Sequence, residues 1–500
     1  MRNLIVLAAI FGIVAARAQK IPDPRPFANS ITETDLKKHL YTIASKDFEG
    51  RETATPGQHK AATYIEDFFK SISLQPGNKG DYQLYYPVFQ DSITSAAIQI
   101  GGTSFELSQD FSVNASANYS ATLFGSEVVF AGYGITDSAH DDYKGLDVKG
   151  KIVMVLDGMP SDILQNQIRK RTFNRFGKQD AAQKNGAIAL LIIQTNFPCK
   201  AGNYDRGNMY LDGYKKVIRP NTFYVSEKIA KAIMGNDYQG KSNLQPKTYN
   251  VNTMLQFSKE TMQLQSSDVL GFLEGTDLKD ELVVISAHYD HLGKRDTLIY
   301  YGADDDGSGT VSLLEIAQAF TKAKAAGRSP RRSILFLANS GEEKGLWGSA
   351  YYTNHPVFPL DKTTVDLNID MIGRIDDTRK KGDSTNYVYV VGDDKLSSDL
   401  KVISETQNKK YSKLELDYKF NDPKDPQRIY YRSDHFNFAE KGVPIIFYYD
   451  GMLDADYHKP TDTPDKINYN VMVKRAKLVF FTAWEMANRN DMLKRDIPLN

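Results

Sequence analysis

Apolar runs of strand length alternate with helical periodicity in the C-terminal half of the chain. From about residue 250 the runs are ELVVISA, RRSILFLA, TVDLNIDMIG, NYVYVVG and VPIIFYY. The segments TVSLLEIAQAFTKAKAAG and NVMVKRAKLVFFTAWEMANR, which lie between and after them, carry apolar residues at helical spacing. Buried strands that alternate with helices predict an α/β fold whose central sheet is mostly parallel and flanked by helices.

The middle of the chain has a different pattern. Between about residues 112 and 248, short β-rich runs such as SEVVFAGYG, GKIVMVLDG and AIALLIIQ are separated by glycines and turn residues. The stretch QDAAQKNG predicts one short helix there. A chain of 500 residues is too long for one simple domain. We therefore expect an inserted β-rich domain at 112–248, with 19–111 and 249–500 forming the main domain.

The charges of the chain are balanced. Lys+Arg and Asp+Glu number 62 each, so no global field favours nucleic acid, and we expect no such partner.

The N-terminus combines basic Arg2, a short apolar core and the sequence Ala-Arg-Ala at 16–18, the pattern of a signal peptide over residues 1–18. That core is too short to span a bilayer, and no later stretch reads as transmembrane. The sequence therefore predicts export to the periplasm or the extracellular space, with Gln19 as the first mature residue.

Polar side chains of ligand type follow several of the predicted strands. Because the carboxyl ends of parallel strands meet at one edge of a sheet, we expect these side chains to lie close together. Asp370 lies inside an apolar run, where a buried carboxylate must be neutralised, paired or bound to a metal. The other positions are His288, Asp290 and His291, the acidic run 304–306, Glu342 and Glu343, and Tyr457 and His458.

An EF-hand calcium loop is an alternative for residues 304–315. Asp304, Asp306 and Glu315 stand at acidic positions of such a loop. However, Ser308 replaces the usual Asp or Asn, and a strand-like run rather than a helix precedes the loop. The pattern therefore favours a site shared between strand ends.

Six segments of the chain resemble the M28 family of co-catalytic zinc exopeptidases. They follow one another in the family's order over residues 283–467: SAHYDHLG, GADDDGSG, NSGEEKGLWGS, LNIDMIGR, SDHFNFAEKGVP and YHKPTDT. The upstream segment DFEGRETATPGQHKAATYI is similar to the family's opening segment. FAGYGI and LDVKGKIVMVL resemble a protease-associated (PA) domain, which is often inserted in these enzymes. The resemblance implies a zinc-exopeptidase fold with a PA-like domain at 112–248.

The resemblance also implies two zinc ions per chain. His288 and Asp370 would hold one ion, and Glu343 and His458 would hold the other. Asp305 would bridge the two ions, and the peptide bond that follows it would be cis. Carboxylates and imidazoles suit zinc, and two such ions neutralise the crowded acids.

Three further residues take roles from the same resemblance. Glu342 would be the general base that activates the water between the metals. Tyr457 would stabilise the oxyanion, and Asp290 would orient the His288 ring. Asp304 and Asp306 would support the loop, and His291 and His435 are expected to have structural or pocket-lining roles.

The implied function is that of a secreted aminopeptidase acting on peptides with a free N-terminus. A glutamate carboxypeptidase-like enzyme remains an alternative, since Arg428 and Arg432 lie in the region where that branch has arginines. A glutaminyl cyclase would use a single zinc, and a non-catalytic receptor-like module would have lost ligands or the base. All five ligand positions and the base are present in this sequence.

Overall fold

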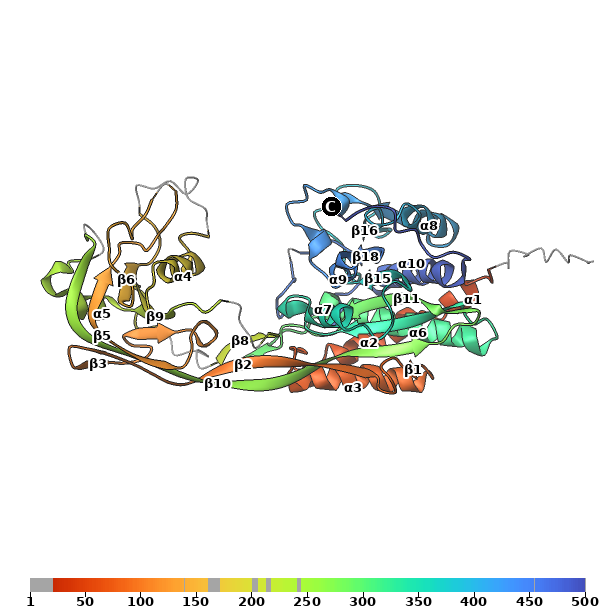
Figure 1. Ribbon diagram of the computed structural model, residues 1–500. Coiled ribbons are helices and arrows are strands. Elements are labelled where there is room, and N and C mark those ends of the chain that lie inside the picture. The colour runs from red at the N-terminus through yellow and green to blue at the C-terminus, as the bar shows by residue number, and fades with distance from the viewer. Residues whose placement is uncertain are drawn as a thin grey trace, which may run out of the picture. The chain divides into compact units, whose positions relative to one another are not determined.

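The computed structural model describes residues 21–138, 140–160, 171–199, 206–212, 217–240, 244–453 and 455–499 (Figure 1). The chain forms two compact units, one from residues before 87 and after 265 and the other from residues 87–265. The expected signal peptide and Gln19 lie outside the described residues. The chain therefore leaves its first unit near residue 87 and returns to it near residue 265.

The first unit is built on a sheet that is parallel at its centre. Its strand order is β17 (Glu415–Asp417), β16 (Tyr387–Val391), β18 (Ile445–Tyr449), β15 (Thr363–Ile369), β11 (Leu278–His288), β14 (Arg332–Asn339) and the end of β10 (Lys247–Leu273). The neighbours β18, β15, β11 and β14 run parallel. β16 pairs antiparallel with β18, and β10 pairs antiparallel with β14. The expected mostly parallel central sheet is therefore confirmed.

Helices pack on both faces of this sheet. The side chains of β11 alternate, so Val283 and Ile285 join one apolar cluster and Val284 joins the other. Trp484 stacks on Phe320 within the first cluster, with ring centroids 5.7 Å apart. The helices of the first cluster include α2 (Glu33–Ile43), α3 (Pro56–Ser71), α6 (Gly309–Ala325) and α10 (Tyr469–Asn488), and those of the second are α7 (Trp347–Asn354) and α9 (His435–Glu440).

Shorter elements complete the first unit. Those that matter for the site are the turns η4 (Ala303–Ser308), η5 (Glu342–Lys344) and η8 (Ile429–Tyr431). The remaining ones are α1 (Arg25–Ala28), η1 (Lys46–Phe48), β1 (Gln75–Pro76), β12 (Lys294–Arg295), β13 (Leu298–Ile299), α8 (Leu400–Gln407), η6 (Asn408–Ser412), η7 (Lys419–Asn421) and η9 (Pro464–Lys466).

The second unit has a parallel core of its own. Its strands β5 (Ala121–Phe130), β6 (Ile152–Leu156), β7 (Ala189–Ile193) and β9 (Asn221–Val225) are parallel neighbours, with β10 and β4 (Phe111–Val113) antiparallel at the two sides. The other elements are β2 (Gln83–Ile100), β3 (Thr103–Phe105), η2 (Ala115–Ala117), α4 (Arg175–Lys184), β8 (Arg206–Tyr210), α5 (Glu227–Met234) and η3 (Gly235–Asp237).

This unit contains the whole segment 112–248 and adds the long strands β2 and β10. The predicted short helix corresponds to α4, and α5 is a second helix that the sequence pattern did not predict. Across the described residues of both units, no helix combines the length and apolar character needed to cross a bilayer.

A buried carboxyl group lies on β15. Asp366 is fully buried, and the Ser286 hydroxyl donates a hydrogen bond to its Oδ1 at 2.7 Å. Burial raises the pKa of Asp366 to about 8, although the bond from Ser286 opposes the shift. In the unfolded chain the pKa of an aspartate is about 3.9. Folding therefore favours the protonated form, and this stabilisation is complete below pH ~4 and is lost as the pH rises through 8.

We expect the free energy of unfolding to fall by ~2 kcal/mol between pH 6 and pH 8 on account of Asp366 alone. Asp366→Asn keeps the shape and the acceptor for Ser286 but cannot ionise, so its stability should lack this component. Urea unfolding of both proteins at the two pH values, with zinc in excess, measures the difference. Equal pH dependence of the two proteins would show that Asp366 does not titrate in this range.

Candidate active site and metal centre

The ends of the parallel strands bring the predicted site residues together. His288 is the last residue of β11, and Asp370 directly follows β15. Glu342 and Glu343 form the turn η5 after β14, and Asp305 lies in η4 just before α6. His458 belongs to the loop that follows β18. Each residue therefore reaches the same edge of the sheet because its strand or loop ends there.

Asp305 lies between two pairs of side chains. Its Oδ1 is 3.3 Å from Nε2 of His288, which is itself 3.5 Å from Oδ1 of Asp370. Its Oδ2 is 3.2 Å from Nε2 of His458, which is 3.0 Å from Oε2 of Glu343. The two carboxylate oxygens thus face two different imidazoles, as a bridging ligand requires. The structure brings all five predicted ligands into one cluster.

The donor atoms of this cluster fit a pair of bound cations. His288 Nε2, Asp305 Oδ2, Glu343 Oε1 and Asp370 Oδ1 are buried. Each lies close to another ionisable group of the cluster, but none forms a hydrogen bond of normal geometry with a described residue. Buried polar atoms in proteins almost always have a partner. The carboxylates of Asp305 and Glu343 overcome the effect of burial and raise the pKa of His458 to about 10, which shows how negative the surroundings are. Imidazole and carboxylate donors in a negative setting suit zinc.

Asp306 and Asp304 take part in holding the acidic loop. Asp306 also lies within metal-binding reach of His288 and Asp370. However, its oxygens accept hydrogen bonds from the backbone amides of His288, Gly309 and Met371, at 2.8 to 3.2 Å. Asp304 accepts one from the amide of Gly373 at 2.8 Å. These bonds agree with the supporting roles predicted for both residues.

The backbone of the acidic loop is tightly constrained. Gly302 has φ +55°, and a Cβ there would lie 2.3 Å from the carbonyl oxygen of Asp305 and 2.5 Å from the His291 ring. Only glycine fits without displacing both groups. The peptide bond between Asp305 and Asp306 is cis, as the resemblance implied.

Glu342 lies beside the cluster with its carboxyl group in a buried setting. Its Oε2 is 3.9 Å from His288 Nε2, and its amide donates a 3.1 Å hydrogen bond to Asp290 Oδ1. Burial raises the pKa of Glu342 well above its ordinary value, and the charges of Asp370 and Glu343 add to the shift. The carboxyl group is therefore unusually basic, which is the property that a general base needs.

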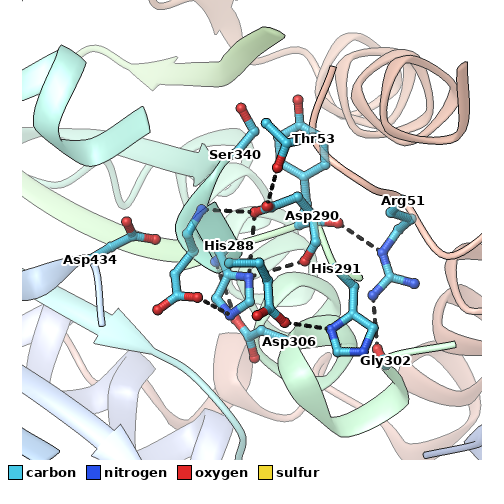
Figure 2. Close-up of polar contacts among 12 residues, drawn as sticks. Arg51, Thr53, His288, Asp290, His291, Gly302, Asp306, Ser340 and Asp434 are labelled. Atoms are coloured by element: carbon cyan, nitrogen blue, oxygen red, sulfur yellow. Dashed lines mark hydrogen bonds and ion pairs between the residues drawn. The ribbon is translucent and has the colours of Figure 1, made fainter. Parts of the chain in front are cut away.

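The predicted orienting residue Asp290 is held from two sides. Thr53 Oγ1 donates to its Oδ2 at 2.6 Å, and the Glu342 amide donates to its Oδ1 (Figure 2). Oδ1 lies 3.6 Å from His288 Nδ1, while the backbone oxygen of Asp290 lies closer to the same nitrogen, at 3.1 Å. The carboxylate of Asp290 therefore faces the His288 ring that it was expected to orient, and the backbone oxygen of Asp290 faces the same ring.

Arg51 is a buried residue of the site that the sequence analysis missed. Its guanidinium donates a hydrogen bond to the carbonyl oxygen of Gly302 at 2.8 Å (Figure 2). It also donates to the carbonyl oxygens of Tyr289, at 2.8 Å, Ile43 and Tyr301. It therefore ties together the two loops that carry His288 and Asp305. Burial lowers the pKa of Arg51 to about 10, so it remains a cation among the acids at neutral pH.

His291 contacts a predicted ligand. It is fully buried, and its Nδ1 lies 2.7 Å from Oε1 of Glu343. The trio His291, Asp305 and Glu343 has its ligand atoms within 4.8 Å of one another. His291 therefore belongs to the wall of the cluster and holds the carboxylate of Glu343 in place.

The structure gives His435 a structural role, as predicted. Its Nε2 lies 2.8 Å from the carbonyl oxygen of Tyr430, and its ring stacks on Phe447. Burial lowers the pKa of His435 to about 3, so the ring is neutral.

A pocket adjoins the cluster. Its lining includes the acids Asp305, Glu342 and Asp370, and its other lining residues are Met371, Ile429, Arg432, Phe447, Tyr449, Leu453 and Tyr457. Most of that second group is apolar, so an apolar side chain of a ligand could lie against it while its polar groups face the acids.

Comparison with known proteins agrees with this geometry. Residues 268–483 match the model of Peptidase family M28. A probable leucine aminopeptidase of Arthroderma otae is 31% identical over 217 residues, which cover 42% of this chain and 56% of that protein. A vacuolar membrane protease of Verticillium alfalfae is 44% identical over 85 residues, which cover 17% of this chain and 8% of that protein. The chain spans about half the length of the leucine aminopeptidases that it matches.

Solved structures share the fold. The aminopeptidase from Aneurinibacillus sp. strain AM-1 superposes with a TM-score of 0.56 at 19% identity, covering 96% of this chain and 100% of that one. The zinc aminopeptidase BSAP from Bacillus subtilis gives a TM-score of 0.52 at 19% identity, covering 96% and 99%. Residues 268–483 therefore match Peptidase family M28 in sequence, and the chain shares its fold with solved aminopeptidases.

Proposed function

We propose that the protein is a two-zinc aminopeptidase that releases the N-terminal residue from peptides. One observation from the region that matches family M28 carries the proposal. Asp305 faces His288 with one carboxylate oxygen and His458 with the other. The basic carboxyl group of Glu342 lies beside them. An aminopeptidase uses this arrangement to bring a peptide carbonyl, a water molecule and a base together.

Five residues would hold the metal ions. His288 and Asp370 would bind one zinc ion, and Glu343 and His458 would bind the other. Asp305 would bind both ions. When bound, such a pair of ions polarises a carbonyl group and makes a water molecule more acidic. His291 and Asp290 would keep the carboxylate of Glu343 and the ring of His288 in place.

The proton transfers fall to Glu342. Its carboxylate would accept a proton from the attacking water as the oxygen adds to the carbonyl carbon. It would then give that proton to the leaving nitrogen as the C–N bond breaks, so that the products are a free amino acid and a shortened peptide. The protonated hydroxyl of Tyr457, which lines the same pocket, would donate a hydrogen bond to the carbonyl oxygen as charge develops there.

The acids of the pocket explain the preference for a free N-terminus. Glu342 and Asp370 both line it, and an α-ammonium group is complementary to them. A charge-assisted hydrogen bond at this point is stronger than a neutral one. The same hydrogen bond would place the first peptide bond of the substrate over the cluster, so substrate binding would also position the reacting groups.

A pair of peptides tests the proposal. We expect the zinc-loaded protein to release the first residue from a short peptide and to lose nearly all of that activity when the same peptide is N-acetylated. Mass spectrometry of the products measures both reactions. Release of C-terminal residues would instead support the carboxypeptidase alternative, and zinc binding without turnover would support a receptor-like module.

We also propose that the protein is exported and that residues 112–248 include a PA-like domain. The sequence pattern of residues 1–18 supports the first proposal, and the motifs FAGYGI and LDVKGKIVMVL support the second. N-terminal sequencing of the exported protein tests export, since an intact Met1 on that material would refute cleavage after Ala18. A solved structure of residues 87–265 that resembled no PA domain would refute the second.

A further inference from the structure

An arginine lies beside the residue assigned to the oxyanion. Arg432 follows η8 and lines the pocket together with Glu342 and Asp370. Its Nη2 lies 3.1 Å from Oη of Tyr457, and its guanidinium carbon is 5.8 Å from the centre of the Tyr457 ring. Among the described residues, no carboxylate lies within ion-pair distance of Arg432. The Tyr457 oxygen is therefore the partner that the structure gives this exposed guanidinium.

The chemistry of the two groups fixes the direction of their hydrogen bond. A guanidinium can only donate, so the Tyr457 oxygen must accept. The ordinary pKa of a tyrosine is about 10, so the phenol keeps its proton at neutral pH. The phenol cannot donate this proton to Arg432, so it can donate it to another acceptor in the pocket.

The phenol ring is also fixed at its face. It stacks on the ring of His458 with centroids 3.8 Å apart and an angle of 19° between the planes. Tyr457 is therefore held by a predicted metal ligand on one face and by Arg432 at its oxygen. A cation that donates into the phenol oxygen also draws electron density from it, which makes its O–H a stronger donor.

We propose that Arg432 is a positioning residue that orients and polarises the Tyr457 hydroxyl toward the carbonyl oxygen of the substrate. The inference rests on the proposed aminopeptidase function and deepens it. Arg432 acts through Tyr457 and stabilises the charge that develops in the transition state. It contributes to kcat rather than to the binding of the substrate.

A double-mutant cycle tests this role with leucine p-nitroanilide, a substrate that carries no carboxylate. We expect Tyr457→Phe to lower kcat by about 10²–10³-fold, the size of the loss of one oxyanion donor. Arg432→Met should lower kcat about tenfold and leave KM within about twofold of the wild-type value. A tenfold effect corresponds to the interaction energy that is typical of two residues in contact. In the double variant kcat should fall no lower than in Tyr457→Phe alone, because Arg432 then has nothing to act through.

Two further variants separate this role from a structural one. Arg432→Lys keeps a cationic donor and should recover part of the loss in kcat. Arg428→Met is the matched control, since that guanidinium packs over Tyr431 at 4.7 Å, and it should leave kcat unchanged. Zinc content and circular dichroism must match the wild type in each variant. If Arg432→Met does not fold, Arg432→Lys takes its place in the cycle.

Two results would overturn the inference. In the first, Arg432→Met still lowers kcat about tenfold in the Tyr457→Phe background, so the two residues act independently. In the second, the effect of Arg432→Met is a rise in KM for leucyl-glutamate that is absent for leucinamide. That result would mean that the guanidinium binds a carboxylate of the substrate. Failure of the proposed function looks different: the zinc-loaded wild type would then not hydrolyse leucine p-nitroanilide at all.

Discussion

Glu342→Gln is expected to lower kcat by about 10²–10⁴-fold and to leave the zinc content unchanged. Glutamine keeps the shape of the side chain, and the backbone amide at this position still donates to Asp290. The variant therefore removes the group that accepts the proton without removing a predicted ligand. Steady-state hydrolysis of a short free-amine peptide, together with the zinc content of the same sample, measures both effects.

Glu440→Gln is the control for this substitution, because Glu440 is an exposed glutamate at the end of α9 and should have no effect. Near-normal turnover in Glu342→Gln would overturn its role as the base. Loss of zinc in that variant would show that Glu342 binds metal instead.

Asp305→Ala is expected to lose zinc and with it all measurable turnover. Asp305 offers one oxygen to each half of the cluster, at 3.3 Å from His288 and 3.2 Å from His458. Removal of this carboxylate weakens both halves at once, whereas loss of any other predicted ligand affects only one. Zinc measured by mass spectrometry after dialysis reports the binding, and peptide hydrolysis reports the activity.

Asp280→Ala is the matched control, since Asp280 is exposed on the same strand that carries His288. It should retain two zinc ions per chain. Full zinc occupancy in Asp305→Ala would mean that a different aspartate of the acidic loop bridges the metals.

The fold of the first unit could be predicted because its central strands are buried on both faces. The runs TVDLNIDMIG and VPIIFYY correspond to β15 and β18, whose residues are all buried and which pair in parallel. The second unit was harder to predict. α5 spans only Glu227–Met234, directly after β9, so its helical period is too short to stand out beside the neighbouring strand. β2 lies wholly before the predicted insert, and β10 begins at its last residues and continues to Leu273. Polar residues interrupt the apolar pattern of both strands, so the sequence did not show that they belong with the insert.

The cluster could be predicted for a related reason. Parallel strands end at one edge, so His288, Asp370 and Glu343 had to lie near one another once their strands were recognised. Arg51 could not be found in this way. It bonds to backbone carbonyls 238 and 251 positions away along the chain, and a contact with a carbonyl leaves no side-chain pattern to detect. The sequence analysis named Arg432, but its contact with Tyr457 could not be predicted, because that contact depends on how two loops fold.

A zinc titration of metal-depleted protein tests the central claim most directly. Zinc bound per chain and hydrolysis of a free-amine peptide are measured in the same samples as zinc is added. The account predicts no hydrolysis without zinc and a rate that reaches its maximum only when two ions are bound per chain. Full hydrolysis by the metal-free protein, or saturation of both binding and rate at one ion per chain, would contradict it.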